Sequence, residues 1–121
     1  MKRHVHDFML RGGDFEKVAL QLWKWQSQHN PDYGRFCHGQ RPSRWQDIPA
    51  IPVALFRDLT LTCFPPIAAA HCFRTSGTTG PRGTHLLQDT ELYDLGAAMH
   101  MQRCIGGVPQ QGISLVSPEF E

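Results

Sequence analysis

A polar segment rich in glycine lies between two short apolar segments, and it limits the local fold more than any other feature of this chain. The segment TSGTTGPRGT, residues 75–84, contains glycine, proline and several hydroxyl side chains. The flanking sequences HCFRT (71–75) and THLLQ (84–88) have the composition of short strands. Glycine and proline favour turns and loops. The pattern therefore predicts two short strands joined by a flexible loop.

The composition of this loop suits the binding of phosphate. Gly77, Gly80 and Gly83 recur at every third position. Glycine lets the backbone approach a ligand closely, and successive backbone N–H groups can then form a concave anion site. Arg82 adds a planar guanidinium that matches phosphate oxygens. The loop lacks the Walker pattern G-x-x-x-x-G-K-[ST]. Composition alone leaves a second interpretation open, a hairpin loop without a ligand.

Two helices are predicted outside this region. The first covers residues 14–30, where Asp14 is a suitable N-cap and Asn30 precedes a proline that ends the helix. The second lies between a cap at position 89 or 90 and a stop at the glycine pair 106–107. Apolar residues recur at helical spacing in both segments.

The remaining segments are less regular. Two prolines keep residues 47–53 extended, and residues 53–56 begin either a short helix or a strand. The alternation in LTLTCF (59–64) predicts a strand, and GISLVSP (112–118) predicts a last one. The order of elements indicates a single mixed α/β domain over residues 1–121, with helices flanking a mixed sheet.

Charge and composition exclude several classes of protein. The 121 residues carry 12 basic and 11 acidic side chains, so the formal net charge is +1. This balance gives no electrostatic argument for nucleic acid or an anionic membrane as a partner. No apolar run approaches the length of a membrane span, and charges interrupt the N-terminal segment where a signal peptide would be apolar. We therefore expect a cytoplasmic protein with reduced cysteines.

Histidines and cysteines were considered as metal ligands and catalytic groups. His100 and Cys104 are four residues apart in the second helix, so both side chains can face one ion. No spacing elsewhere completes a ligand set, and we predict thiols and surface imidazoles in place of a metal site. Cys72 is close to the loop, but no base can be assigned to it. His85 is expected at the end of a strand, facing solvent.

The sequence FRTSGTTGPRGTH resembles the phosphate-binding signature T-S-G-[ST]-T-G-x-P-K-G of the adenylate-forming (ANL) superfamily. TSGTTG matches throughout, whereas the residue before the proline is missing and arginine replaces the usual lysine. The resemblance implies the N-terminal portion of an ANL-type domain that uses ATP and Mg²⁺. It assigns the ATP phosphates to Thr75, Ser76, Gly77, Thr78, Thr79, Gly80 and Arg82.

The segment WQDIPAIPVALFRDLTL (45–61) narrows this resemblance, because it is similar to the region before the loop in LuxE-like acyl-protein synthetases. The resemblance implies adenylation of a carboxylic (fatty) acid, followed by transfer of the acyl group to a thiol acceptor. The motifs that the family carries further downstream are not found in this sequence. We therefore expect an N-terminal fragment that needs a complementing C-terminal region or a partner subunit. The alternative is a non-catalytic α/β module that keeps a relic nucleotide loop and acts through partner contacts.

Overall fold

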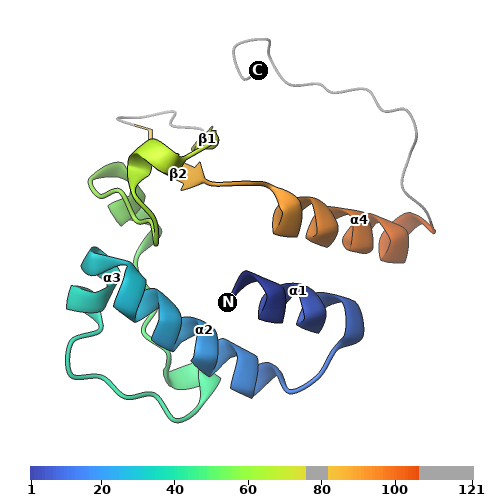
Figure 1. The fold of residues 1–121 in the computed structure, drawn as a ribbon, viewed down its shortest axis with the longest axis horizontal. Helices are drawn as coiled ribbons and strands as arrows, with labels where there is room; N and C mark the ends of the chain where they lie inside the picture. The colour runs from blue at the N-terminus through green and yellow to red at the C-terminus, as the bar shows by residue number, and fades with distance from the viewer. Residues whose placement is uncertain (76–81, 107–121) are drawn as a thin grey trace. The chain divides into compact units, whose positions relative to one another are not determined.

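The computed structural model describes residues 1–75 and 82–106, and these belong to two compact units, 1–90 and 91–121 (Figure 1). Helices and one sheet are both present, so the predicted mixed α/β class is confirmed. Within the described ranges, the sheet has two antiparallel strands and is not a larger mixed sheet. The helices and strands are α1 (Lys2–Arg11), α2 (Phe15–His29), α3 (Pro31–Phe36), β1 (His71–Arg74), β2 (Thr84–Leu87) and α4 (Glu91–Ile105). Three short 3₁₀ helices are η1 (Trp45–Asp47), η2 (Val53–Arg57) and η3 (Pro66–Ala68).

Helix α2 begins and ends where the sequence predicts. The Asp14 side chain accepts a hydrogen bond from the Lys17 backbone N–H at 3.0 Å, which satisfies one of the donors that a helix N-terminus leaves open. The helix ends at His29, and Asn30 is extended because a proline follows it. The short helix α3 starts at that proline, so a residue predicted to stop one helix also begins the next.

Helix α1 was not predicted, because charged residues interrupt its sequence. Its half-buried residues Val5, Phe8 and Met9 nevertheless recur at helical spacing, and they line an apolar cavity of about 370 Å³ together with residues of α2. The rings of Phe8 and Phe15 lie 6.1 Å apart between centroids. Packing of this narrow apolar stripe against α2 stabilises α1, as is usual for short helices. Gly12 ends the helix with a positive φ of 73°.

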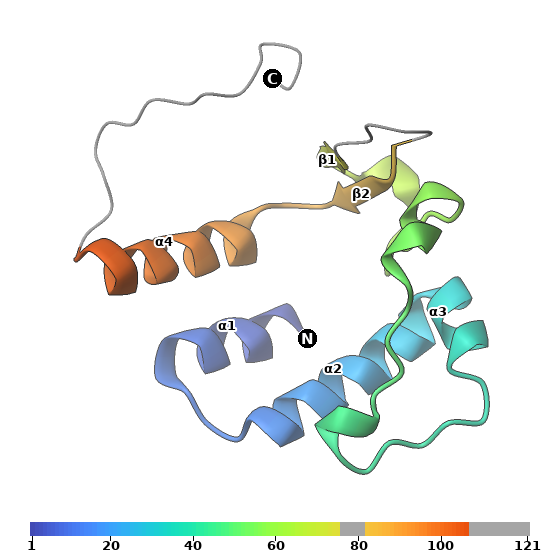
Figure 2. The same cartoon turned by 180° about the vertical axis from the view of Figure 1, so that it is seen from behind.

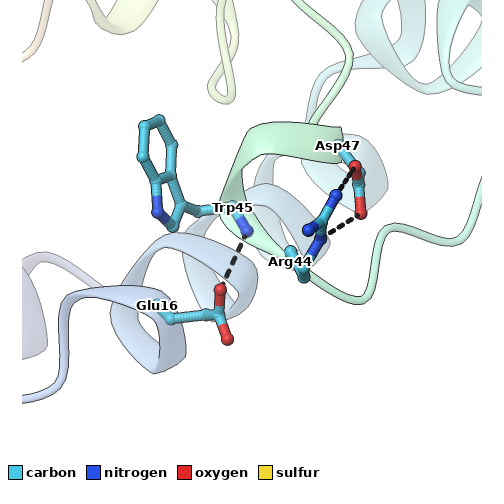
Figure 3. A network of polar contacts seen from close by, with 4 residues as sticks. All are labelled: Glu16, Arg44, Trp45 and Asp47. Atoms are coloured by element: carbon cyan, nitrogen blue, oxygen red, sulfur yellow. Dashed lines mark hydrogen bonds and ion pairs between the residues drawn. The ribbon is translucent and has the colours of Figure 1, made fainter.

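The segment that begins with η1 is attached to the first turn of α2 (Figure 3). The Trp45 backbone N–H donates to a Glu16 carboxylate oxygen at 3.4 Å. The Trp45 and Phe15 rings meet edge-on, with 5.5 Å between their centroids. Arg44 pairs with Asp47 at 3.3 Å, and this hydrogen bond raises the pKa of the Arg44 guanidinium. These contacts hold the start of residues 45–61 against the helical part of the unit.

The prediction of a strand at residues 59–64 is wrong. The Leu59 N–H donates to the Leu55 carbonyl at 2.8 Å, an α-type bond at the end of η2, and the Thr62 N–H donates to the Thr60 carbonyl at 3.1 Å. The Thr62 hydroxyl also donates to the Phe64 carbonyl at 2.7 Å. Such local bonds compete with a strand ladder, and no neighbouring strand pairs with this segment in the part of the chain that the structure describes. Residues 53–56, left open between helix and strand, belong to η2.

Helix α4 forms the described part of the second unit. It covers Glu91–Ile105, and Gly106 ends it with a φ of 75°, as predicted for the glycine pair. The strand predicted over residues 112–118 lies outside the described residues. Within residues 1–75 and 82–106, no helix is long and apolar enough to cross a membrane.

Few side chains are deeply buried in the first unit. Within the described ranges, Cys37 is the one apolar side chain classed as buried, with 5% of its surface exposed, and Asn30 is the one buried polar side chain. Val53 and Ile67 are 73% and 95% exposed. A unit with so few buried side chains has a small core for its length. Burial of apolar surface supplies most of the free energy of folding, so this core is the main source of stability.

Candidate phosphate-binding hairpin

Strands β1 and β2 form an antiparallel hairpin that brings the two ends of the glycine-rich segment together (Figure 2). The register pairs His71 with Leu87 and Arg74 with Thr84. Both strands were predicted from their composition, and both are confirmed. The hairpin therefore presents the segment between Arg74 and Thr84 from a paired stem.

Two hydrogen bonds close the stem beyond its last strand pair. The Thr75 N–H donates to the Gly83 carbonyl, and the Gly83 N–H donates to the Thr75 hydroxyl oxygen, each at 2.9 Å. The Thr75 hydroxyl thus takes the place of a backbone carbonyl and extends the stem by one further hydrogen-bonded pair. The sequence motif predicted a phosphate contact for Thr75 and gave no signal for this closing role.

The described residues include part of the predicted site. Thr75 belongs to the closing pair, and Arg82 directly precedes the other member, Gly83, and is exposed. The other predicted residues lie outside the described ranges: Ser76, Gly77, Thr78, Thr79 and Gly80. What the structure places is therefore the loop end of the stem, where the Thr75 hydroxyl accepts a hydrogen bond and Arg82 is exposed.

Gly83 is buried where the hairpin meets η2. A Cβ atom at this position would lie 3.4 Å from the backbone carbonyl carbon, the carbonyl oxygen and the Cβ of Phe56, which is the near limit of ordinary van der Waals contact. Gly83 therefore packs directly against η2, as well as belonging to the predicted phosphate loop. The Phe56 and His85 rings meet edge-on, with 5.3 Å between their centroids.

A cavity of about 270 Å³ lies beside the hairpin and has a mostly apolar lining. Ile51, Phe56 and Leu61 contribute apolar groups, and Cys63 and His85 also line it. Burial raises the pKa of the Cys63 thiol, which keeps it protonated and a poor nucleophile near neutral pH. His85 is exposed as predicted, yet it also reaches this cavity.

Tyr33 supplies a polar group at the edge of the same cavity. Its hydroxyl donates to the Pro49 carbonyl at 2.8 Å, which connects α3 to the extended proline segment. Burial raises the pKa of the Tyr33 phenol, and the neighbouring Cys37 thiol adds to this rise. The phenol is therefore neutral at physiological pH. Together with Cys63, it leaves the cavity suited to an apolar group.

The described residues contain no cluster of three or more histidine, cysteine, aspartate or glutamate side chains able to hold a metal ion. All four cysteines are free thiols: Cys37 is buried, Cys63 is half-buried, and Cys72 and Cys104 are exposed. Cys72 belongs to β1, at the base of the hairpin.

No protein-family model, curated protein or solved structure matches this chain. The resemblance to adenylate-forming enzymes therefore rests on the residues quoted above.

We expect Thr75→Val to open the loop end of the hairpin stem. Valine keeps the branched shape but cannot accept the hydrogen bond from Gly83, so the Gly83 N–H loses its partner at a cost of about 1 kcal/mol. Hydrogen exchange of the Gly83 amide, followed by NMR, is the measurement. Thr75→Ser keeps the acceptor and serves as the matched control. Equal exchange rates in the valine and serine variants would contradict this role.

Proposed function

We propose that this chain is the N-terminal part of an ATP-dependent acyl-protein synthetase of the LuxE-like, adenylate-forming type, acting in the cytoplasm. Thr75, Arg82 and the residues of TSGTTG between them bind the ATP phosphates together with Mg²⁺. The observation that carries the proposal is the closed hairpin stem at Thr75 and Gly83, which holds both ends of the segment that contains this motif. Bound in this way, the segment can direct its N–H and hydroxyl donors at one anion.

The proposed reaction has two steps. A carboxylate oxygen of the fatty acid attacks the α-phosphorus of ATP, an acyl–phosphate bond forms, and pyrophosphate leaves. A thiol sulfur then attacks the acyl carbonyl carbon, the thiol proton passes to a base, and AMP leaves. The loop contributes positioning and stabilisation of phosphate charge, because phosphoryl chemistry of this kind depends on oriented donors. Mg²⁺ adds charge neutralisation when it is bound with ATP.

The cavity beside the hairpin supports an apolar substrate. Its apolar lining and its neutral Tyr33 and Cys63 side chains suit a hydrocarbon chain. The high pKa of Cys63 argues against this thiol as the acyl acceptor near neutral pH. We therefore place the acceptor outside this cavity, on a complementing region or a partner subunit.

A second candidate function is a non-catalytic module that acts through partner contacts. The exposed side chains of Val53 and Ile67 favour it, since apolar groups exposed to this extent often mark contact surfaces. A complementing region of the enzyme would cover the same groups. Binding of ATP distinguishes the two functions, because the module retains the loop only as a relic.

We expect the full chain to bind Mg²⁺-ATP weakly, with little preference over GTP, because phosphate contacts dominate. Arg82→Ala should weaken this binding about tenfold, or about 1.4 kcal/mol, through the loss of a charge-assisted hydrogen bond. An NMR titration of the labelled chain up to millimolar nucleotide measures both affinities. Arg11→Ala removes an equal charge from the last turn of α1 and should leave the affinity unchanged.

Three results would overturn the proposal. Absence of ATP binding by the wild-type chain at millimolar concentration would identify the loop as a relic and favour the non-catalytic module. Equal affinity of the wild type and Arg82→Ala would remove Arg82 from the phosphate site. An equal loss for Arg11→Ala and Arg82→Ala would mean that net charge, and not a built site, attracts the nucleotide.

A further inference from the structure

Helix α4 carries a histidine and a cysteine whose side chains meet on one face. His100 and Cys104 are four residues apart, which places them one above the other along the helix. The Cys104 Sγ atom lies 3.5 Å from His100 Nε2 and 4.0 Å from Nδ1. Both residues are exposed, so an ion in solution can reach them.

This separation is the one that a tetrahedral metal ion requires of two such ligands. Zinc binds a histidine nitrogen at about 2.0–2.1 Å and a cysteine sulfur at about 2.3 Å. With a tetrahedral angle between these bonds, the nitrogen and sulfur are about 3.6 Å apart. The observed 3.5 Å between Nε2 and Sγ is close to this separation, but Sγ also lies only 4.0 Å from Nδ1, so the His100 ring must turn to direct Nε2 at the ion. Both side chains are exposed, so this rotation is open to them. We propose that His100 and Cys104 form a two-ligand site for Zn²⁺ or a similar borderline divalent cation.

The position on the helix also favours a cation. Cys104 is in the last turn of α4, which ends at Ile105, and the carbonyl groups of a helix C-terminus carry partial negative charge. Arg103 is in the same turn and opposes the cation, but adjacent residues point about 100° apart around a helix. The site has only two protein ligands, and the positive charge of Arg103 is nearby. The bound ion is therefore labile, and water completes its coordination.

Cys72, which also has a histidine neighbour in the sequence, provides an internal comparison. His71 and Cys72 are adjacent in strand β1, where successive side chains point to opposite faces of the sheet. They therefore cannot chelate one ion. Because Cys72 is exposed like Cys104, it controls for binding by a single accessible thiol.

Titration of the reduced full chain with Co²⁺ tests the site, because a cysteine-bound cobalt ion gives a thiolate-to-metal charge-transfer band. We expect this band in the wild type and in Cys72→Ser, and its loss in Cys104→Ser. His100→Gln should weaken the binding about tenfold, since the chelate becomes a single thiolate bond. Added Zn²⁺ should remove the band and slow alkylation of Cys104, but not of Cys72, as read by mass spectrometry.

Two results would overturn the proposal. A charge-transfer band that survives in Cys104→Ser would place the metal elsewhere. Equal affinity of His100→Gln and the wild type would mean that Cys104 binds alone and that its contact with His100 is only a thiol–imidazole hydrogen bond. Neither outcome depends on ATP binding, so this test is independent of the proposed enzymatic function.

Discussion

Gly34→Ala should strongly destabilise the junction between α2 and α3. A Cβ atom at position 34 would lie 2.5 Å from the backbone carbonyl oxygen of Ser27, far closer than two such atoms can approach. Because the obstacle is backbone in α2, no side-chain rotation can relieve the clash, and α3 must move away from α2. We expect a loss of about 2–4 kcal/mol in the free energy of unfolding, the range of severe overpacking.

Hydrogen exchange of the α2 and α3 amides, together with urea unfolding followed by circular dichroism, measures this loss. Gly39→Ala is the matched control, since a Cβ atom there meets nothing within 4 Å. Gly39 has a φ of +75°, so its replacement still costs about 1 kcal/mol of backbone strain. If Gly34→Ala costs no more than Gly39→Ala, the close approach of the two helices is not a determinant of stability.

Asn30→Ala is expected to have the second largest effect. The Asn30 side chain is 7% exposed, and its Oδ1 accepts a hydrogen bond from the Tyr33 N–H at 3.0 Å. It caps the N-terminus of α3, while its backbone N–H donates to the Gln26 carbonyl at the end of α2. Alanine removes the cap and leaves a partly buried donor without its partner, so we expect a loss of about 2 kcal/mol.

The chain offers a matched comparison for this substitution. Asp14 caps α2 with the same geometry, at 3.0 Å from the Lys17 N–H, but at an exposed position. Asp14→Ala should cost about 1 kcal/mol, because water can replace the lost acceptor. Urea unfolding of both variants gives the difference. Equal losses would show that burial of the Asn30 cap adds nothing to the stability.

Much of the secondary structure was predictable because its signals are local. Asp14 and the Asn30-Pro31 pair determine the two ends of α2, and Gly106 ends α4. The strand composition on both sides of the glycine-rich segment likewise predicted β1 and β2. In each case the stabilising contact joins residues close in sequence, or the backbone preference belongs to one residue.

The two strands that flank the candidate site were predictable from the sequence, and the phosphate-binding role of its residues stays a prediction. A pattern of glycine, hydroxyl and arginine indicates an anion site, and that pattern located Thr75 and Arg82 at the mouth of a hairpin. The sequence did not indicate that the Thr75 hydroxyl closes the stem or that Gly83 packs against Phe56. Both roles depend on a neighbour whose position no local pattern encodes.

Local sequence by itself determined where α2, α4 and the hairpin begin and end, since capping, proline geometry and glycine conformation act within a few residues. Tertiary structure decided the remainder. Helix α1 is stabilised by an apolar stripe that packs against α2, and residues 59–64 alternate like a strand but have no partner strand among the described residues. The 3.5 Å between His100 and Cys104 depends on side-chain rotamers, which helical spacing permits but does not select. Amphipathic segments gain their free energy from the surface that they cover, so only the folded arrangement determines which of them become ordered.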